Sequence, residues 1–156
     1  MPYLYQGLNN IGFPGQATRN LGFGPIGGDS RLPLFNWKDK RILLVEDEEL
    51  NMLYLKTILA PTEVALIGAY SGSELRSNFD QLSTFSLVLL DIRLPDSSGW
   101  DLIKEIKSLC PTLPVIIQTA YAMSSDKQKS LESGCDDYIT KPINKLSLLE
   151  MISKYI

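Results

Sequence analysis

The sequence contains no histidine among its 156 residues. The chain therefore has no imidazole that could act as a general base, bind a metal or carry a phosphoryl group. Any chemistry must use carboxylates, lysine, hydroxyl groups and the backbone. Only two cysteines are present, Cys110 and Cys135, and they lack the CxxC spacing of zinc and redox sites. We expect reduced, partly buried thiols at both positions.

An excess of positive charge and long apolar runs are also missing. The net charge is −3, the pI is about 5.0 and the lysines are scattered, which argues against direct binding of nucleic acid. No apolar run approaches the roughly 20 residues that cross a bilayer, and the N-terminus has no signal-peptide pattern. We expect no membrane insertion and a cytoplasmic location, either as a free chain or as a piece of a larger protein.

Residues 1–36 differ in composition from the rest of the chain. Glycine, proline and asparagine recur there, and no apolar period of 2 or 3.6 persists. Two short echoes, Asn10–Phe13 and Asn20–Phe23, are too few to indicate a repeat fold. We predict a flexible leader or linker over residues 1–36 and one folded domain over residues 37–156.

From residue 41 onward, short apolar runs alternate with segments of helical period. We predict five strands, over residues 41–45, 64–69, 86–91, 114–119 and 137–140. A helix is expected after each strand, over residues of about 50–60, 71–82, 100–109, 124–134 and 146–155. In the first helix, the period places these residues on one face: Leu50, Leu53, Tyr54, Thr57 and Ile58.

Three of the strands are apolar throughout, which is typical of parallel strands buried on both faces. Right-handed crossovers between them predict an α/β fold with a doubly wound, five-stranded parallel sheet. If its topology is the flavodoxin-like (βα)5 one, the strand order is 2-1-3-4-5. In such sheets, ligands bind beyond the carboxyl ends of the strands, where the strand order switches.

Chemically active side chains stand at these carboxyl ends. The first strand ends in Glu46 and Asp47, the third in Asp91 and the fourth in Thr119, and the fifth is followed by Lys141. The first and third strands are neighbours in the predicted order, so the three carboxylates should converge. A hard divalent cation such as Mg²⁺ would remove their mutual repulsion. With a lysine and a hydroxyl beside it, Asp91 has the surroundings of a nucleophile for a phosphoryl group.

Four segments resemble the successive motifs of bacterial response-regulator receiver domains, the CheY-like family of two-component signalling: ILLVEDEELNMLYLKTIL, LVLLDIRLPDSSGWDLIKEIK, LPVIIQTAYAM and GCDDYITKPI. The resemblance spans residues of about 39–156. It implies that Asp91 is the phosphoacceptor and that Mg²⁺ or Mn²⁺ is the cofactor. Asp47 would bind the metal directly and Glu46 through water, with Asp91 and the backbone carbonyl of Arg93 as further ligands.

The resemblance assigns the residues around this centre as well. Thr119 would donate a hydrogen bond to the phosphoryl oxygen and act with Tyr138 as the switch pair, and Lys141 would pair with the phosphoryl group. Arg93 and Tyr121 stand where family members vary and tune the lifetime of the phosphoryl group. A cis peptide bond is implied before Pro142, as X–Pro bonds permit.

The implied function is that of a phosphorelay receiver rather than an enzyme, with no reaction beyond its own phosphorylation and dephosphorylation. A histidine kinase or a histidine phosphotransfer domain would be the donor. The face made by the fourth helix, the fifth strand and the last helix would change shape as the output, and it offers a site for a homodimer. Residues 35–40, 118–123 and 134–138 further resemble receivers of hybrid sensor histidine kinases, which suggests the C-terminal receiver of a membrane-bound sensor.

Two other classes of function stay open at this point. Haloacid-dehalogenase-type phosphatases also use an aspartate at a strand end as nucleophile, but they carry a second acid two residues later, where this chain has Arg93. The other alternative is an interaction module that keeps the fold without being phosphorylated. Turnover of a phosphate ester would support the first, and failure to bind beryllofluoride with Mg²⁺ would support the second.

Overall fold

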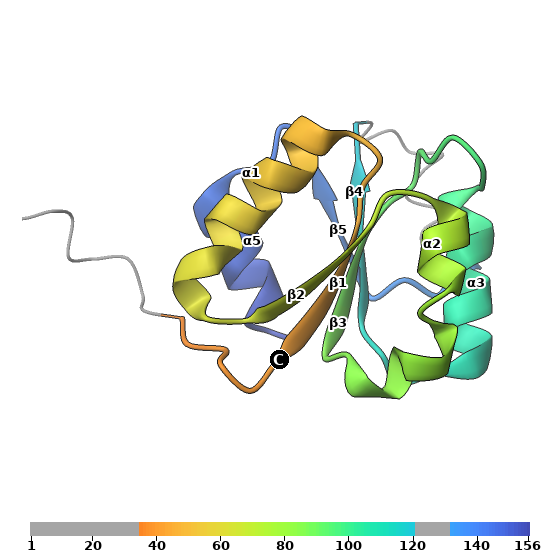
Figure 1. Cartoon of the computed structure of the whole chain (residues 1–156), viewed down its shortest axis with the longest axis horizontal. Helices are drawn as coiled ribbons and strands as arrows, with labels where there is room; N and C mark the ends of the chain where they lie inside the picture. The colour runs from red at the N-terminus through yellow and green to blue at the C-terminus, as the bar shows by residue number, and fades with distance from the viewer. Residues whose placement is uncertain (1–34, 121–131) are drawn as a thin grey trace, which may run out of the picture. The chain divides into compact units, whose positions relative to one another are not determined.

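The structure, a computed structural model, describes residues 35–120 and 132–156. Five parallel strands form one sheet in these residues, in the order β2-β1-β3-β4-β5 (Figure 1). Their bounds are β1 Arg41–Val45, β2 Ala65–Ala69, β3 Leu87–Asp91, β4 Val115–Thr119 and β5 Asp137–Thr140. The predicted α/β class, the parallel pairing and the strand order are confirmed.

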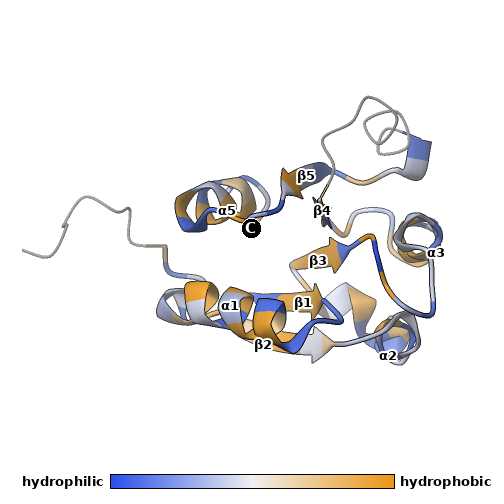
Figure 2. Cartoon of the chain, turned by 90° about the horizontal axis from the view of Figure 1, so that it is seen from above, coloured by the Kyte–Doolittle hydropathy of each residue, from blue (hydrophilic) through white to orange (hydrophobic). Residues whose placement is uncertain are grey.

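Helices cover both faces of this sheet (Figures 1 and 2). One face carries α1 (Glu49–Leu59) and α5 (Lys145–Ile152), and the other carries α2 (Gly72–Arg76) and α3 (Gly99–Leu109). Two short 3-10 helices, η1 (Ala60–Thr62) and η2 (Phe79–Thr84), follow α1 and α2. Most of the helix predicted over residues 124–134 lies outside the described residues. No helix in the described part is long and apolar enough to cross a membrane.

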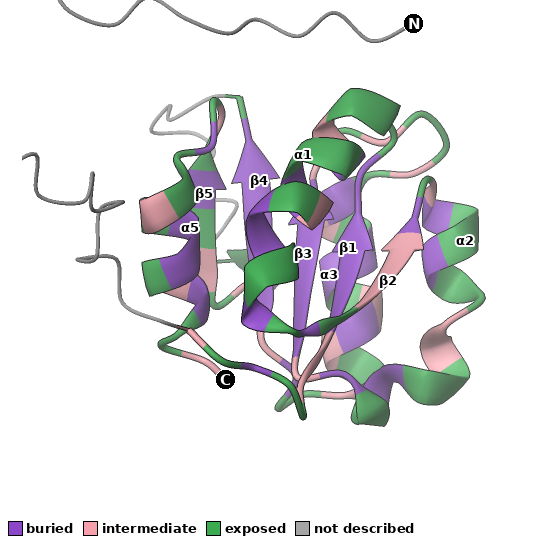
Figure 3. Cartoon of the chain, turned by 60° about the vertical axis from the view of Figure 1, so that its left-hand side comes forward, coloured by how far each residue is buried: buried purple, intermediate pink, exposed green. Residues whose placement is uncertain are grey.

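Alternate residues of each central strand enter two separate apolar clusters. In β1, Ile42 and Leu44 pack with α1 and α5. Leu43 and Val45 pack with α2 and α3 on the other face. Because both faces are covered, a central strand must be apolar at every position, and β1, β3 and β4 are buried along nearly their whole length (Figure 3).

The first helix buries a different face from the one predicted. Its buried residues are Met52, Leu55, Ile58 and Leu59. Of the five residues predicted to share a face, only Ile58 is buried, whereas Leu50 is 81% and Leu53 61% exposed. The segment ELNMLYLKTIL carries two overlapping apolar stripes, so its helical period is compatible with either. Contact with Ile42 and Leu44 of β1 determines which of the two stripes is buried.

The second predicted helix is shorter than expected. It ends at Arg76 and is followed by η2 rather than continuing to residue 82. Ser71 caps it as predicted, because its hydroxyl accepts a hydrogen bond from Glu74 N at 3.1 Å. Ser77 Oγ and Asn78 Nδ2 donate to backbone carbonyls four residues earlier. Such short polar side chains compete with the helical hydrogen bonds and favour an early end.

The chain described by the structure begins with two packed aromatic residues. Trp37 is 6% exposed, and its backbone N donates to the Thr62 carbonyl at 2.7 Å. Phe35 lies against it, with 5.3 Å between the ring centroids. The division into a leader over residues 1–36 and a domain over residues 37–156 stays a prediction, because residues 1–34 lie outside the described part.

The loop that follows Asp91 is closed by Gly99, the first residue of α3. Gly99 N donates to the Ile92 carbonyl at 3.1 Å, and a Cβ atom at this position would clash with the Ile92 backbone. We predict that Gly99→Ala lowers the free energy of unfolding by about 2 kcal/mol, as measured in urea. Gly68→Ala is the control, because its Cβ would meet the flexible end of Met52 at 3.4 Å. Equal stability of the two variants would contradict this prediction.

Candidate functional site

Three carboxylates meet at the carboxyl ends of two neighbouring strands. Glu46 and Asp47 directly follow β1, and Asp91 is the last residue of β3, which pairs with β1. One carboxylate oxygen from each residue lies within 4.8 Å of the others. The convergence predicted from the strand order is therefore present in the structure.

Lys141 joins two of these acids from the residue after β5. Its Nζ donates to Glu46 Oε2 at 2.8 Å and to Asp91 Oδ2 at 2.5 Å. The Lys141 backbone N also donates to the Thr119 carbonyl at 2.8 Å, which attaches this segment to the end of β4. The peptide bond between Lys141 and Pro142 is cis, the form that the resemblance implies.

The Glu46 carboxylate has no exposed surface. Burial raises its pKa above the ordinary 4.5, although hydrogen bonds from Lys141 and Asn51 act in the opposite direction. Burial also opposes the charge on Lys141, but the bonds to Asp91 and Glu46 prevail, so the pKa of Lys141 lies above its ordinary 10.5. The lysine is therefore positively charged at neutral pH and compensates the buried acids.

The β3–α3 loop fixes the second oxygen of Asp91. Arg93 N donates to Asp91 Oδ1 at 2.7 Å. Asp96, the other acid of this loop, is bound elsewhere, because its carboxylate accepts hydrogen bonds from Gly72 N and from Ser73 N and Oγ at the start of α2. Those bonds lower the pKa of Asp96 to about 2. Asp96 thus anchors α2 to the loop and takes no part in the acid cluster.

The other predicted site residues lie around this centre at different depths. Thr119 is the last residue of β4 and is 3% exposed. Tyr138 lies on β5 and is 40% exposed, so its side chain stands partly in solvent. Tyr121 lies outside the described residues. The roles assigned to Thr119, Tyr138 and Tyr121 stay predictions.

Of two residues that the sequence did not single out, Asn51 contacts the site and Gln118 lies outside it, in the strand that carries Thr119. Asn51, in the first turn of α1, donates from Nδ2 to Glu46 Oε1 at 3.2 Å and to Glu48 Oε2 at 3.0 Å. Gln118 is fully buried on β4, next to Thr119. Its signal in the sequence is a polar residue within the apolar run VIIQT, which a strand covered on both faces should not contain.

The acid cluster suits a hard divalent cation. Three carboxylates face one lysine, so the group carries an excess of negative charge, and every side-chain ligand is an oxygen, as Mg²⁺ and Mn²⁺ prefer. Both oxygens of Glu46 accept hydrogen bonds from protein groups. The Asp47 side chain is exposed and accepts none from the residues that the structure describes. Asp47 therefore has the oxygens most open to a metal.

Comparison with known proteins gives a family for this chain. The family model described as the response regulator receiver domain matches residues 42–153. DivK of Brucella ovis, a polar-differentiation response regulator, is 34% identical over 119 residues, which cover 75% of this chain and 96% of DivK. Two larger proteins match as well: the sensor protein GacS of Pseudomonas syringae and the hybrid signal transduction histidine kinase I of Dictyostelium discoideum, each 31% identical.

The lengths of these two relatives differ greatly from that of this chain. The match with GacS covers 79% of this chain but 14% of GacS, and the match with the Dictyostelium kinase covers 99% of this chain but 9% of that protein. The chain thus spans a small part of either of these two proteins and nearly all of DivK.

Solved structures agree with this assignment. A CheY-like receiver domain protein from Methanospirillum hungatei is 35% identical, with a TM-score of 0.69, over 74% of this chain and 91% of that one. The receiver domain of Ssk1 from Saccharomyces cerevisiae, solved with the histidine phosphotransfer protein Ypd1, is 27% identical, with a TM-score of 0.69, over 75% and 88%. The family match and the sheet topology agree, and the chain belongs to the family of response regulator receiver domains in two-component signalling.

Proposed function

We propose that this chain is the phosphoacceptor of a phosphorelay and that Asp91 takes a phosphoryl group from a phosphohistidine. The observation that carries the proposal is the bridge from Lys141 Nζ to both Asp91 and Glu46. It sets a positive charge beside Asp91, whose two oxygens are held by Arg93 N and Lys141 Nζ. An aspartate that only supported the fold would not need two further acids at the same end of the sheet.

In the proposed reaction, a carboxylate oxygen of Asp91 attacks the phosphorus atom of the phosphohistidine. An O–P bond forms and the P–N bond breaks, with its electron pair returning to the imidazole of the donor. The products are an acyl phosphate on Asp91 and an unmodified donor histidine. Arg93 N and Lys141 Nζ hold the carboxylate in place, and we propose that Lys141 then pairs with the phosphoryl oxygens.

We assign the metal site to the acid cluster. Asp47 would bind Mg²⁺ or Mn²⁺ directly, Glu46 would bind it through water, and Asp91 and the Arg93 carbonyl would complete the protein ligands. A bound divalent cation supplies positive charge for the oxygens of the transferring phosphoryl group. The hydrogen bonds on both oxygens of Glu46 support an indirect role for this residue.

The donor is proposed to be a histidine kinase or a histidine phosphotransfer domain, as in the complex of Ssk1 with Ypd1. The exposed stripe of α1 offers it a docking surface. Leu50, Leu53 and Tyr54 are 81%, 61% and 47% exposed, on a helix that starts just after the acids. Apolar side chains exposed together in this way are typical of interaction sites.

The output surface is proposed to include β5 and α5, with the fourth helix outside the described residues as its third part. Tyr138 is half-exposed on β5, and its proposed movement is an inward turn when the end of β4 moves toward a phosphoryl group on Asp91. The same surface is our candidate for a homodimer contact. A larger parent chain of the hybrid kinase type is also a proposal, based on the matches with GacS and the Dictyostelium kinase.

The proposed function predicts metal-dependent labelling by a small phosphodonor. With acetyl phosphate and Mg²⁺, the wild-type chain should gain the mass of one phosphoryl group, and EDTA should prevent the gain. Asp47→Asn should raise the Mg²⁺ concentration for half-maximal labelling at least about tenfold, because metal binding loses a charged ligand. Glu63→Gln, a change of an exposed acid outside the site, should label like wild type. Labelling in EDTA, or none in Mg²⁺, would contradict the proposal.

A further inference from the structure

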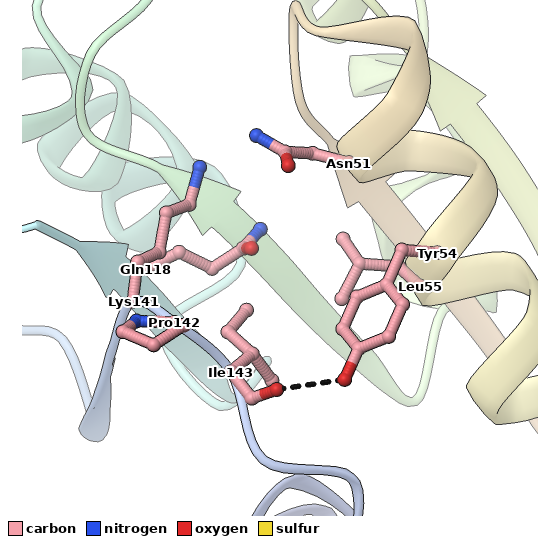
Figure 4. A pocket seen from close by; sticks show the side chains of 7 residues that line it. All are labelled: Asn51, Tyr54, Leu55, Gln118, Lys141, Pro142 and Ile143. Carbon is pink, nitrogen blue, oxygen red and sulfur yellow. Dashed lines mark hydrogen bonds between the residues drawn. The ribbon is translucent and has the colours of Figure 1, made fainter.

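The side-chain amide of Gln118 is buried and lines the inner end of a surface pocket. The residue has no exposed surface, and neither Nε2 nor Oε1 has a hydrogen-bond partner among the described residues. Its amide points into a pocket of about 260 Å³ between α1 and the segment after β5 (Figure 4). The other lining residues are Asn51, Tyr54, Leu55, Lys141, Pro142 and Ile143.

The position of this amide is costly for the fold. Buried polar groups are normally paired, and an unpaired amide costs stability that an apolar side chain of the same length would not. The neighbouring strand residues Ile116 and Ile117 are apolar and buried. Packing alone therefore gives no reason for an amide at residue 118, whereas a group that enters the pocket and pairs with it would.

Two of the residues that line the pocket also contact acids of the phosphorylation site. Lys141 pairs with Asp91, and Asn51 donates to Glu46. A third lining residue, Tyr54, belongs to the exposed stripe of α1. Its hydroxyl donates a hydrogen bond to the Ile143 carbonyl at 2.9 Å (Figure 4). A protein that delivers a phosphoryl group to Asp91 buries roughly 800 Å² on each partner. Because Lys141 both contacts Asp91 and lines the pocket, we expect the surface of such a protein to cover the pocket.

The chemistry of the walls indicates what the donor places there. Leu55, Pro142 and Ile143 are apolar, so a charged group would lose its hydration. Lys141, the charged residue in the lining, is already paired with two acids. The Gln118 amide offers hydrogen-bond donors and an acceptor side by side. An uncharged carboxamide, from asparagine or glutamine, matches this edge with two reciprocal hydrogen bonds and packs its methylene groups on the apolar walls.

We propose that Gln118 is a specificity residue for the phosphohistidine donor and that its pocket receives a carboxamide side chain from that protein. The inference rests on the proposed function, which makes a phosphohistidine protein the donor. The amide is already unpaired among the described residues, and a donor with an apolar side chain at this place would leave it so. Discrimination between donors then comes from the two hydrogen bonds that a carboxamide gains.

The test separates protein donors from a small phosphodonor. Gln118→Met keeps the length of the side chain and loses both hydrogen bonds, so labelling by acetyl phosphate should stay at the wild-type level. Transfer from a panel of purified phosphorylated histidine phosphotransfer domains, Ypd1 among them, should need about tenfold more donor for half-maximal rate, with the maximal rate unchanged. Gln81→Met, the same change at an exposed residue of η2, should transfer like wild type.

A second measurement does not depend on a variant. The side-chain NH₂ protons of Gln118 should exchange with water more slowly by NMR when the donor is bound. Equal transfer to the wild type and to Gln118→Met, or no change in exchange, would mean that the pocket holds water only and would overturn the inference. It would also fall if no donor in the panel labelled the wild type while acetyl phosphate did. Failure of acetyl phosphate as well would instead count against the proposed function.

Discussion

Replacing Asp91 with asparagine is expected to reduce phosphoryl incorporation from acetyl phosphate at least roughly 1,000-fold, because an amide is a poor nucleophile at the position of the attacking oxygen. Asparagine has nearly the same shape and can still accept the hydrogen bond from Arg93 N. Lys141 would keep its bond to Glu46. The fold should therefore survive, and the loss can be assigned to chemistry. Intact mass measures the incorporation, and circular dichroism checks the fold.

The site of labelling has its own control. Asp101→Asn changes an exposed carboxylate in the first turn of α3, close to Asp91 in the chain, and should label like wild type. The phosphoryl group on the wild type should be released by hydroxylamine, as an acyl phosphate is, and peptide mapping should locate it at Asp91. Labelling of Asp91→Asn at the wild-type level would refute the assignment of the phosphoacceptor.

Replacing Lys141 with methionine is expected to lower the free energy of unfolding by about 3 kcal/mol in EDTA, because two acids would remain together without their cation. Glu46 has no exposed side-chain surface and Asp91 9%, while the lysine side chain is 22% exposed. Urea denaturation measures the loss. Lys104→Met, at an exposed position of α3, should change stability by less than about 0.5 kcal/mol. Similar values for the two variants would contradict this account of Lys141.

The destabilisation by Lys141→Met should depend on pH. Burial already raises the pKa of Glu46 above 4.5, and loss of the lysine removes a hydrogen bond that lowers it. A carboxyl group whose pKa is raised in the folded state favours folding when protonated, and this contribution is lost as the pH rises through that pKa. The difference between wild type and variant should therefore shrink from about pH 8 toward about pH 5. Added Mg²⁺ should also reduce it at neutral pH.

Much of the fold followed from short-range patterns. An apolar run that ends in an acid predicts a buried parallel strand, and β1 and β5 have the predicted bounds while β2, β3 and β4 begin one residue later than predicted. The acid cluster followed from the strand order, because residues at the carboxyl ends of neighbouring strands must meet. A strand covered on both faces is apolar at every position, so a short continuous apolar run is enough to indicate it.

The predictions for α1 and α2 were wrong where the local sequence is compatible with more than one structure. The segment from Leu50 to Leu59 carries two apolar stripes of helical period, and the local sequence favours neither. Ser77 and Asn78 ended α2 early through side-chain bonds to the backbone, which compete with a weak helical signal. The helical period does not indicate the contact of Asn51 with Glu46, because Glu46 precedes the helix and the turn between the two residues sets their distance.

The sequence by itself determined the chemistry available to this protein. Without histidine, it supplies acids, a lysine and a hydroxyl, and their positions after apolar runs place them at one edge of a parallel sheet. The tertiary structure decided which of these groups touch. Lys141 contacts Glu46 and Asp91, which lie 95 and 50 positions earlier in the chain. Gln118 lines a pocket that α1 also lines. Such contacts depend on packing between distant segments, whose relative positions no local period specifies.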